Sequence, residues 1–253
     1  MHARMAVVLA ATLLAGGECA AAEIRVLATT AMKAALDELA PRFAIASSHT
    51  AQIVYGPSGA LAKRVAAGEA ADLVILAGGI GDLIARGKVL AGSRADVASA
   101  RIGVAVRKGA VRPDISSPDA LKRSLLAARS VAFASPASGG ASGAYLAGMF
   151  ERLGIAAEID AKARLARGGP DGMVSALVAA GEAEIGLQQM PEILSVDGVD
   201  LVGPLPGALQ TVTVYSAGVL AASEHPDAAR ALVAFLMTPA AAAVLTSKGL
   251  EPP

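Results

Sequence analysis

The sequence contains no tryptophan, a single cysteine and only 3% aromatic residues in 253 positions, and its 22 basic residues balance its 22 acidic ones. Proteins that bind nucleic acid usually have an excess of lysine and arginine, or aromatic side chains that stack on bases, so we expect no nucleic-acid partner. Cys19 lies in an N-terminal segment that we expect to be removed, which leaves no thiol for a disulfide, a nucleophile or a metal site. The histidines His2, His49 and His225 are not spaced as metal ligands, so we predict neither a metal site nor a cofactor.

Long hydrophobic runs are also missing. After the N-terminal segment no stretch approaches 18 consecutive apolar residues, so we expect no stable membrane insertion. Residues 1–22 have the pattern of a secretory signal peptide: Arg4, an apolar stretch over residues 5–15, and the small residues Ala20, Ala21 and Ala22. The apolar stretch is shorter than the roughly 20 residues that span a bilayer. We therefore predict cleavage after residue 22 and a periplasmic protein.

Apolar residues are abundant, at 54% of the chain, which is enough to bury the cores of one large or two small domains. Short runs typical of strands alternate with helical patterns. Residues 24–28 are followed by apolar positions at helical spacing up to Phe43, residues 72–76 read as a buried parallel strand, and residues 211–220 form the longest strand pattern. This alternation predicts an α/β fold with mostly parallel sheets flanked by helices.

The stretch from residue 131 to residue 150 reads VAFASPASGGASGAYLAGMF and predicts a strand, a turn of small residues and a helix. Gly139, Gly140 and Gly143 would let the backbone approach a ligand closely, and Ser142 would add a hydroxyl beside the unpaired N–H groups of the helix start. Such a turn can bind an anion.

The same arrangement of strand, small-residue turn and helix recurs along the chain. In open α/β sheets, ligands bind outside the carboxyl ends of the strands, where such turns gather. Several helix N-termini there would offer N–H donors and hydroxyls to a small anion without a buried lysine or arginine. Ordinary helix capping needs the same residue types, and that alternative stays open. The four turns are at residues 29–31, 56–59, 135–142 and 168–171.

From residue 24 to residue 253 the order of motifs resembles the periplasmic molybdate-binding family of ABC importers, a branch of the type II solute-binding proteins. The matching segments are VLATTAMKAALDELAPRF (26–43), YGPSGALAKRVAAGEAADLVIL (55–76), SPASGGASGAYLAGMFERLG (135–154), LVAAGEAEIGLQQ (177–189) and DAARALVAFLMTPAAAAVL (227–245). The resemblance implies a two-lobed type II periplasmic-binding-protein fold with the ligand cleft between the lobes. We expect a monomer with lobe 1 at residues 23–105 plus 212–253, lobe 2 at residues 106–211, and two connecting segments that act as a hinge.

The resemblance also implies a ligand site. Members of the family hold a tetrahedral oxyanion with serines in the first two turns, backbone N–H groups in the third and fourth, and a tyrosine hydroxyl. Here Ala31 stands at the first serine position, Gln189 at the tyrosine position and Asp171 at the fourth site, where only its backbone N–H suits an anion. The predicted ligand-binding residues are Thr29, Thr30, Ala31, Ser58, Gly59, Ala141, Ser142, Gly143, Asp171, Gln188 and Gln189.

The leading functional prediction is an extracytoplasmic solute-binding protein that captures a small anion for an ABC importer, with the permease as its partner. The departures from the family at Ala31 and Gln189 favour an organic carboxylate over a molybdate-like oxyanion, because the amides of Gln188 and Gln189 can both donate and accept hydrogen bonds.

The alternative is an enzyme. The sequence is also similar to aconitate isomerase, an extracytoplasmic enzyme related to this family, which interconverts cis- and trans-aconitate by a 1,3-proton shift. That resemblance implies an anion site together with a positioned acid or base. The candidates are Lys33, Tyr145 and Asp171, although a surface position, helix packing and a helix-start charge respectively would also explain them.

Overall fold

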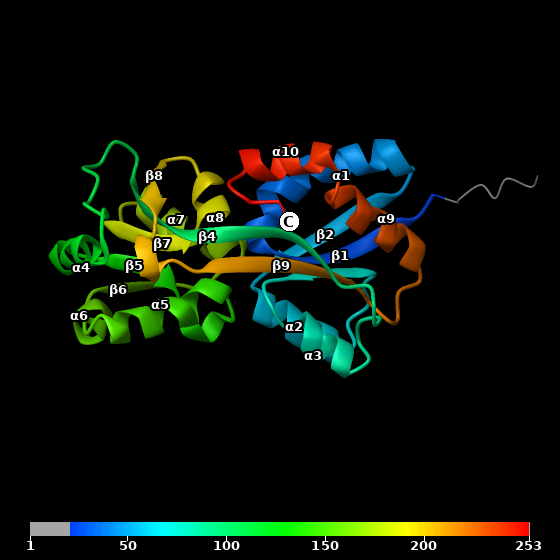
Figure 1. Cartoon of the computed structure of the whole chain (residues 1–253), viewed down its shortest axis with the longest axis horizontal. Coiled ribbons are helices and arrows are strands. Elements are labelled where there is room, and N and C mark those ends of the chain that lie inside the picture. The colour runs from blue at the N-terminus through cyan, green and yellow to red at the C-terminus, as the bar shows by residue number, and fades with distance from the viewer. Residues whose placement is uncertain (1–20, 253) are drawn as a thin grey trace, which may run out of the picture.

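Strand β4 (Ala95–Arg107) runs through both halves of the molecule (Figure 1). Its first part, up to Arg101, pairs antiparallel with β9 (Val212–Val219), and from Ile102 onward it pairs antiparallel with β7 (Ile185–Gln189). The computed structural model describes residues 21–252. Most of the predicted signal peptide, residues 1–20, therefore lies outside the described residues.

The strands form one continuous sheet in the order β2-β1-β3-β9-β4-β7-β5-β6, and β8 (Val199–Pro204) also pairs with β4. In the first half, β1 (Glu23–Thr29) lies parallel between β2 (Thr50–Gly56) and β3 (Leu73–Leu76). In the second half, β5 (Val131–Ala134) lies parallel between β6 (Ala163–Ala166) and β7.

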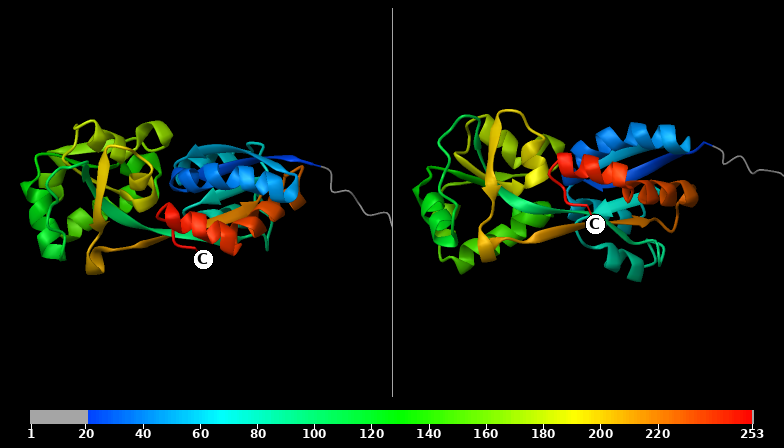
Figure 2. Two further views of the ribbon diagram at one scale, coloured as in Figure 1. Left: turned by 90° about the horizontal axis from the view of Figure 1, so that it is seen from above. Right: turned by 45° about the horizontal axis from the view of Figure 1, so that its top comes forward.

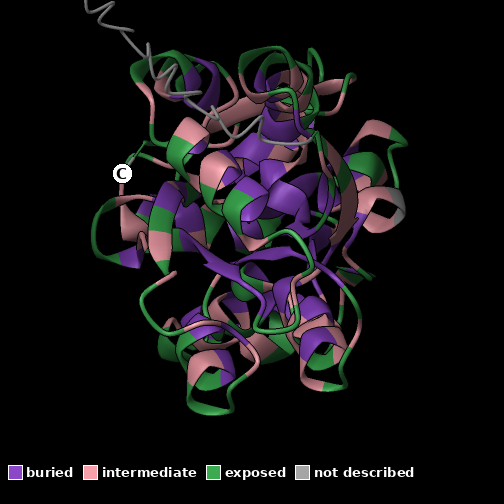
Figure 3. Cartoon of the chain, turned by 90° about the vertical axis from the view of Figure 1, so that its right-hand side faces the viewer, coloured by how far each residue is buried: buried purple, intermediate pink, exposed green. Residues whose placement is uncertain are grey.

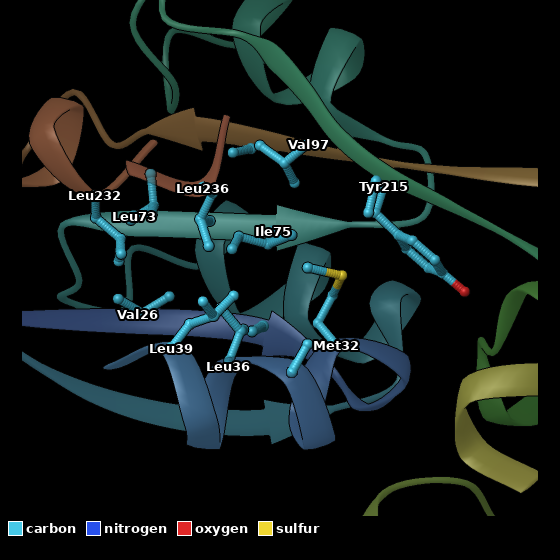
Figure 4. Close-up of a cluster of buried hydrophobic side chains, with 14 of the residues drawn as sticks. Val26, Met32, Leu36, Leu39, Leu73, Ile75, Val97, Tyr215, Leu232 and Leu236 are labelled. Carbon is cyan, nitrogen blue, oxygen red and sulfur yellow. The ribbon is translucent and has the colours of Figure 1, made fainter. Parts of the chain in front are cut away.

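Helices cover both faces of the first half because its strands are apolar on both sides. Val26 and Ile75 face a core built with α1 (Lys33–Ser47), α9 (Pro226–Leu236) and α10 (Pro239–Ser247), as Figure 4 shows for part of this cluster. Their neighbours Leu27 and Val74 face the opposite side, where α2 (Ser58–Ala66) and α3 (Ile80–Ala85) pack. The alternation follows from the two-residue period of a strand.

The second half is built in the same way. Phe133 of β5 packs with α4 (Pro118–Ala127), α5 (Ala141–Arg152) and α6 (Ala156–Asp160), whereas Ala132 packs against α7 (Val174–Ala179) on the other face. The remaining short elements are α8 (Met190–Leu194) and the 3-10 helices η1 (Thr30–Met32), η2 (Pro136–Ser138), η3 (Pro170–Gly172) and η4 (Gly207–Leu209).

The predicted α/β fold is confirmed, and its sheet is mixed. Among the strand pairs within residues 21–252, every antiparallel pair involves β4 or β9, and the others are parallel. These two strands run between the halves, which lie side by side in Figure 2.

The pairing of β4 changes between Arg101 and Ile102, slightly before the boundary expected at residue 105. The lobe boundaries at 23–105 with 212–253 and at 106–211 stay a prediction.

Burial follows this architecture. In Figure 3, buried residues gather on the strands and on the helix surfaces that face them, and exposed residues lie on the outer helix faces and loops. Within the described part of the chain, no single helix is long and apolar enough to cross a membrane. The pair α9 and α10, which meets that test only when the two are taken together, is bent by 67°.

Candidate functional site

A pocket lies between the two halves, where β1, β5, β6 and β7 end. Its empty volume, including the open mouth, is ≈ 470 Å³. The first half contributes the residues that follow β1 and β3 together with the start of α2, and the second half contributes the starts of α5 and α7. The polar side chains that line it are those of Thr29, Thr30, Ser58, Ser138, Ser142, Gln188, Gln189, Glu192 and Tyr215.

Most of the predicted ligand-binding residues line this pocket. The structure brings them together from segments up to 160 positions apart. Each lies at or after the carboxyl end of a strand, and the parallel strands of the two halves run in opposite directions, so their carboxyl ends meet at the pocket. This convergence is what the turns of small residues predicted, although the ligand contacts themselves stay a prediction. The predicted residues that line the pocket are Thr29, Thr30, Ala31, Ser58, Ala141, Ser142, Gln188 and Gln189.

The other predicted ligand-binding residues lie beside the pocket. The N–H group of Gly59 donates a hydrogen bond of 2.9 Å to the carbonyl oxygen of Gly139, so it joins the two halves. Gly143 lets α5 pack closely on the end of β5, since a Cβ at this position would lie 2.6 Å from the carbonyl oxygen of Ala134. Asp171 belongs to η3, next to the pocket residue Gly172.

Two of the predicted acid or base candidates lie away from the pocket. The ammonium group of Lys33 forms an ion pair with Asp37 at the surface and lies 4.9 Å from the centre of the Tyr55 ring. The hydroxyl of Tyr145 donates a hydrogen bond of 2.9 Å to the carbonyl oxygen of Leu209. The structural explanations considered for both residues therefore match their environments.

Three buried polar atoms at the pocket have no hydrogen-bond partner among the described residues: Thr30 Oγ1, Gln189 Oε1 and the Tyr215 hydroxyl. The Nε2 group of Gln189 is fixed, because it donates a hydrogen bond of 2.8 Å to Thr213 Oγ1. A buried polar atom without a partner costs roughly 1–3 kcal/mol, so these atoms are stabilised when a bound molecule supplies the partner. They therefore mark the pocket as a site for a polar ligand.

Ser58 offers a further donor. Its Oγ accepts a hydrogen bond of 2.9 Å from the N–H group of Ala77, which follows β3. A hydroxyl that accepts in this way keeps its own hydrogen for a second partner. Ser58 therefore fixes the start of α2 against β3 and can still donate into the pocket.

Glu192 was not recognised from the sequence. It follows Pro191 in the first turn of α8, where an acidic residue is expected for the helix dipole alone. Its carboxyl lines the pocket and accepts a hydrogen bond from the Gln188 side chain, whose Oε1 is in turn held at 2.9 Å by the N–H group of Ser175. Burial raises the pKa of Glu192 to about 7, although the Gln188 hydrogen bond opposes this shift.

Tyr215 was also missed, because in the sequence it is one aromatic residue inside the longest apolar strand. The structure buries its ring in the core of the first half and directs its hydroxyl away from that core (Figure 4). Burial, together with the nearby charge of Glu192, raises the pKa of Tyr215 well above its usual value. The phenol therefore stays protonated and is available as a hydrogen-bond donor.

The charge of the pocket restricts its ligand chemistry. Among the described residues that line it there is no lysine and no arginine, and Glu192 is the acidic one. A negatively charged guest would be held by hydroxyls, amides and backbone N–H groups. Among the side chains that the structure describes, no three or more of histidine, cysteine, aspartate or glutamate cluster in a way that could hold a metal ion.

Known proteins resemble this chain in both sequence and fold. The family model described as bacterial extracellular solute-binding protein matches residues 24–251. A protein named aconitate isomerase, from a Pseudomonas species, is 39% identical over 236 residues, which cover 90% of this chain and 87% of that protein.

Solved structures of anion-binding proteins share the fold. The periplasmic molybdate-binding protein of Azotobacter vinelandii superposes with a TM-score of 0.72 at 20% identity, covering 91% of this chain and 99% of that one. The sulfate-binding protein SubI of Mycobacterium tuberculosis superposes with a TM-score of 0.71 at 21% identity, covering 91% and 87%. These likenesses confirm the predicted type II periplasmic-binding fold. By its match over residues 24–251, the chain belongs to the bacterial extracellular solute-binding protein family.

Proposed function

We propose that this protein is an isomerase that interconverts cis- and trans-aconitate in the pocket between its halves. The observation that carries the proposal is the 39% identity to an aconitate isomerase over 90% of the chain. We further propose that it acts in the periplasm after removal of residues 1–22, in keeping with the extracellular family to which it belongs.

The reaction needs no cofactor. A proton leaves the methylene carbon of the substrate, the double bond moves by one position, and a proton is added to the carbon at the other end of the former double bond. Atoms and electrons balance without an oxidant or reductant. The site needs only to hold three carboxylates and to move one proton.

The chemistry of the pocket supports this reaction. Thr30 and Tyr215 have buried hydroxyls without partners in the described protein, and such groups can donate to carboxylate oxygens. Glu192 supplies a titratable carboxyl beside them, with a pKa of about 7. Efficient acid–base catalysis requires a group whose pKa lies near the working pH.

The proposal is tested by incubating the purified protein with cis-aconitate at neutral pH and following the trans isomer by chromatography. We expect the same equilibrium mixture to be reached from either isomer, at a rate proportional to protein concentration. Heat-denatured protein serves as the control. A protein whose melting temperature is raised by aconitate or another anion, but which produces no isomer, would overturn the proposal and favour capture of that anion for an ABC importer.

A further inference from the structure

We propose that Glu192 carries the proton in this isomerisation and that the hydroxyl of Tyr215 holds the substrate carboxylate on which negative charge develops. This assignment rests on the proposed function and identifies the reacting groups of that site. Neither residue is among the candidates suggested by the sequence, which were Lys33, Tyr145 and Asp171.

The two residues come from opposite halves and meet at one pocket. Glu192 lies on α8 of the second half, and Tyr215 lies on β9 with its ring buried in the core of the first half. The Tyr215 hydroxyl is fully buried, has no partner among the described residues, and interacts electrostatically with the Glu192 carboxyl. A substrate bound between the halves would therefore meet both groups.

The surroundings of Glu192 fix its position. Pro191 and Ile193, on either side, are buried and anchor the short helix α8. The Gln188 side chain, itself 4% exposed, is oriented by the N–H group of Ser175 and donates to the Glu192 carboxyl. A carboxyl held in this way remains in one place while its proton leaves and returns.

The protonation states suit a proton carrier. The pKa of Glu192, raised by burial to about 7, gives both the carboxylate and the carboxylic acid near neutral pH. Among the described residues that line the pocket, Tyr215 is the other side chain that titrates as an acid, and its raised pKa keeps it protonated. Glu192 can therefore act first as a base and then as an acid.

The step balances within the site. The Glu192 carboxylate takes a proton from the substrate methylene group, so that one C–H bond breaks and an O–H bond forms. The electron pair spreads over the allylic carbons and into the carboxylate held by Tyr215. Glu192 then returns the proton to the other end of the allyl system, the new C–H bond forms, and the residue is again a carboxylate.

The test compares the wild type with Glu192→Gln, which keeps the size of the side chain and an oxygen that can accept from Gln188. General acid–base groups contribute about 10²–10⁴-fold, so we expect kcat to fall at least about 100-fold. The affinity for trans-aconitate, measured by calorimetry, should not decrease. Glu158→Gln, on the exposed surface of α6, is the matched control and should behave as the wild type.

Two further readouts separate catalysis from a structural role. Glu192→Asp retains a carboxyl and should keep part of the activity that Glu192→Gln loses. The kcat/KM of the wild type should rise with pH through an apparent pKa near 7, and this rise should be absent in Glu192→Gln.

The outcomes are distinguishable. An inactive wild type would overturn the proposed function and this assignment with it. An active wild type accompanied by an equally active Glu192→Gln would overturn the assignment alone. If Glu192→Gln lost both aconitate binding and activity, Glu192 would be a binding group, and its role as proton carrier would be overturned.

Discussion

Several polar residues of the pocket lower the stability of the folded protein, because their buried oxygen atoms have no hydrogen-bond partner in the described structure. The unpartnered oxygens of Thr30, Gln189 and Tyr215 each oppose folding by roughly 1–3 kcal/mol, and no neighbouring side chain in the described structure offsets this. Replacement by apolar residues of similar size would remove the cost. Their presence at one pocket is therefore explained by a ligand that pairs with them, rather than by packing.

Glu192 should make stability depend on pH. Its folded-state pKa of about 7 lies above the ordinary value of 4.5, so the folded protein binds the proton more tightly than the unfolded chain. The resulting stabilisation is fully present below pH 4.5 and is lost as pH rises through 7. At pH 8, the free energy of unfolding of Glu192→Gln should exceed that of the wild type by up to about 3 kcal/mol, because each unit of pKa shift corresponds to roughly 1.4 kcal/mol.

Urea unfolding of both proteins at pH 5 and pH 8 measures this difference. The free energies of unfolding should lie closest at pH 5, and the gap in favour of the variant should widen at pH 8. A gap that does not change with pH would show that Glu192 titrates normally in the folded protein.

At the scale of elements, local sequence predicted where helices begin. Ser117 caps α4 by accepting from the N–H group of Ala120, and Pro118 starts the helix. A serine followed by a proline is a local signal for a helix start. Small residues likewise predicted the start of α5. These helix starts depend on residues within a few positions of one another, so they can be predicted from the sequence without knowledge of the fold.

Features that depend on contacts between distant segments could not be predicted from the local sequence. Only residues 102–106 of β4 have a clear strand pattern in the sequence, whereas the strand extends over Ala95–Arg107, because β9 pairs with its first part. Glu192 and Tyr215 became visible as site residues only when the fold brought them to the same pocket. Burial and convergence depend on segments far apart in the chain.

The start of α2 contacts the second half directly, and this contact can be weakened by one methyl group. A Cβ at Gly59 would lie 3.0 Å from the carbonyl oxygen of Gly139 and 3.1 Å from its Cα. Gly59→Ala should therefore oppose closure of the halves and weaken the binding of trans-aconitate about tenfold, which corresponds to about 1.4 kcal/mol.

The matched control is Gly81→Ala. Gly81 is also the second residue of its helix, α3, and a Cβ there would meet nothing within 4 Å. Because alanine favours a helix over glycine by roughly 1 kcal/mol, this variant should be at least as stable as the wild type and should bind the ligand normally. Equal affinities for Gly59→Ala and Gly81→Ala in calorimetric titration would argue against a role for the contact at Gly59 in closure.

At the scale of the whole molecule, the pocket exists because two halves share one continuous sheet. Strands β4 and β9 connect the halves, and the pocket takes its walls from both. The family of binding proteins uses such an arrangement to enclose a solute, and an enzyme needs little more than a proton carrier in the same enclosure. We propose that Glu192 is that addition.

The most direct measurement is a crystal structure of Glu192→Gln grown with trans-aconitate, in which turnover should be blocked. We predict aconitate between the halves, with carboxylate oxygens within hydrogen-bond distance of Thr30 Oγ1 and the Tyr215 hydroxyl, and a reacting carbon beside the side chain at position 192. Aconitate bound elsewhere on the molecule, or in the pocket with its allylic carbons away from position 192, would contradict this prediction.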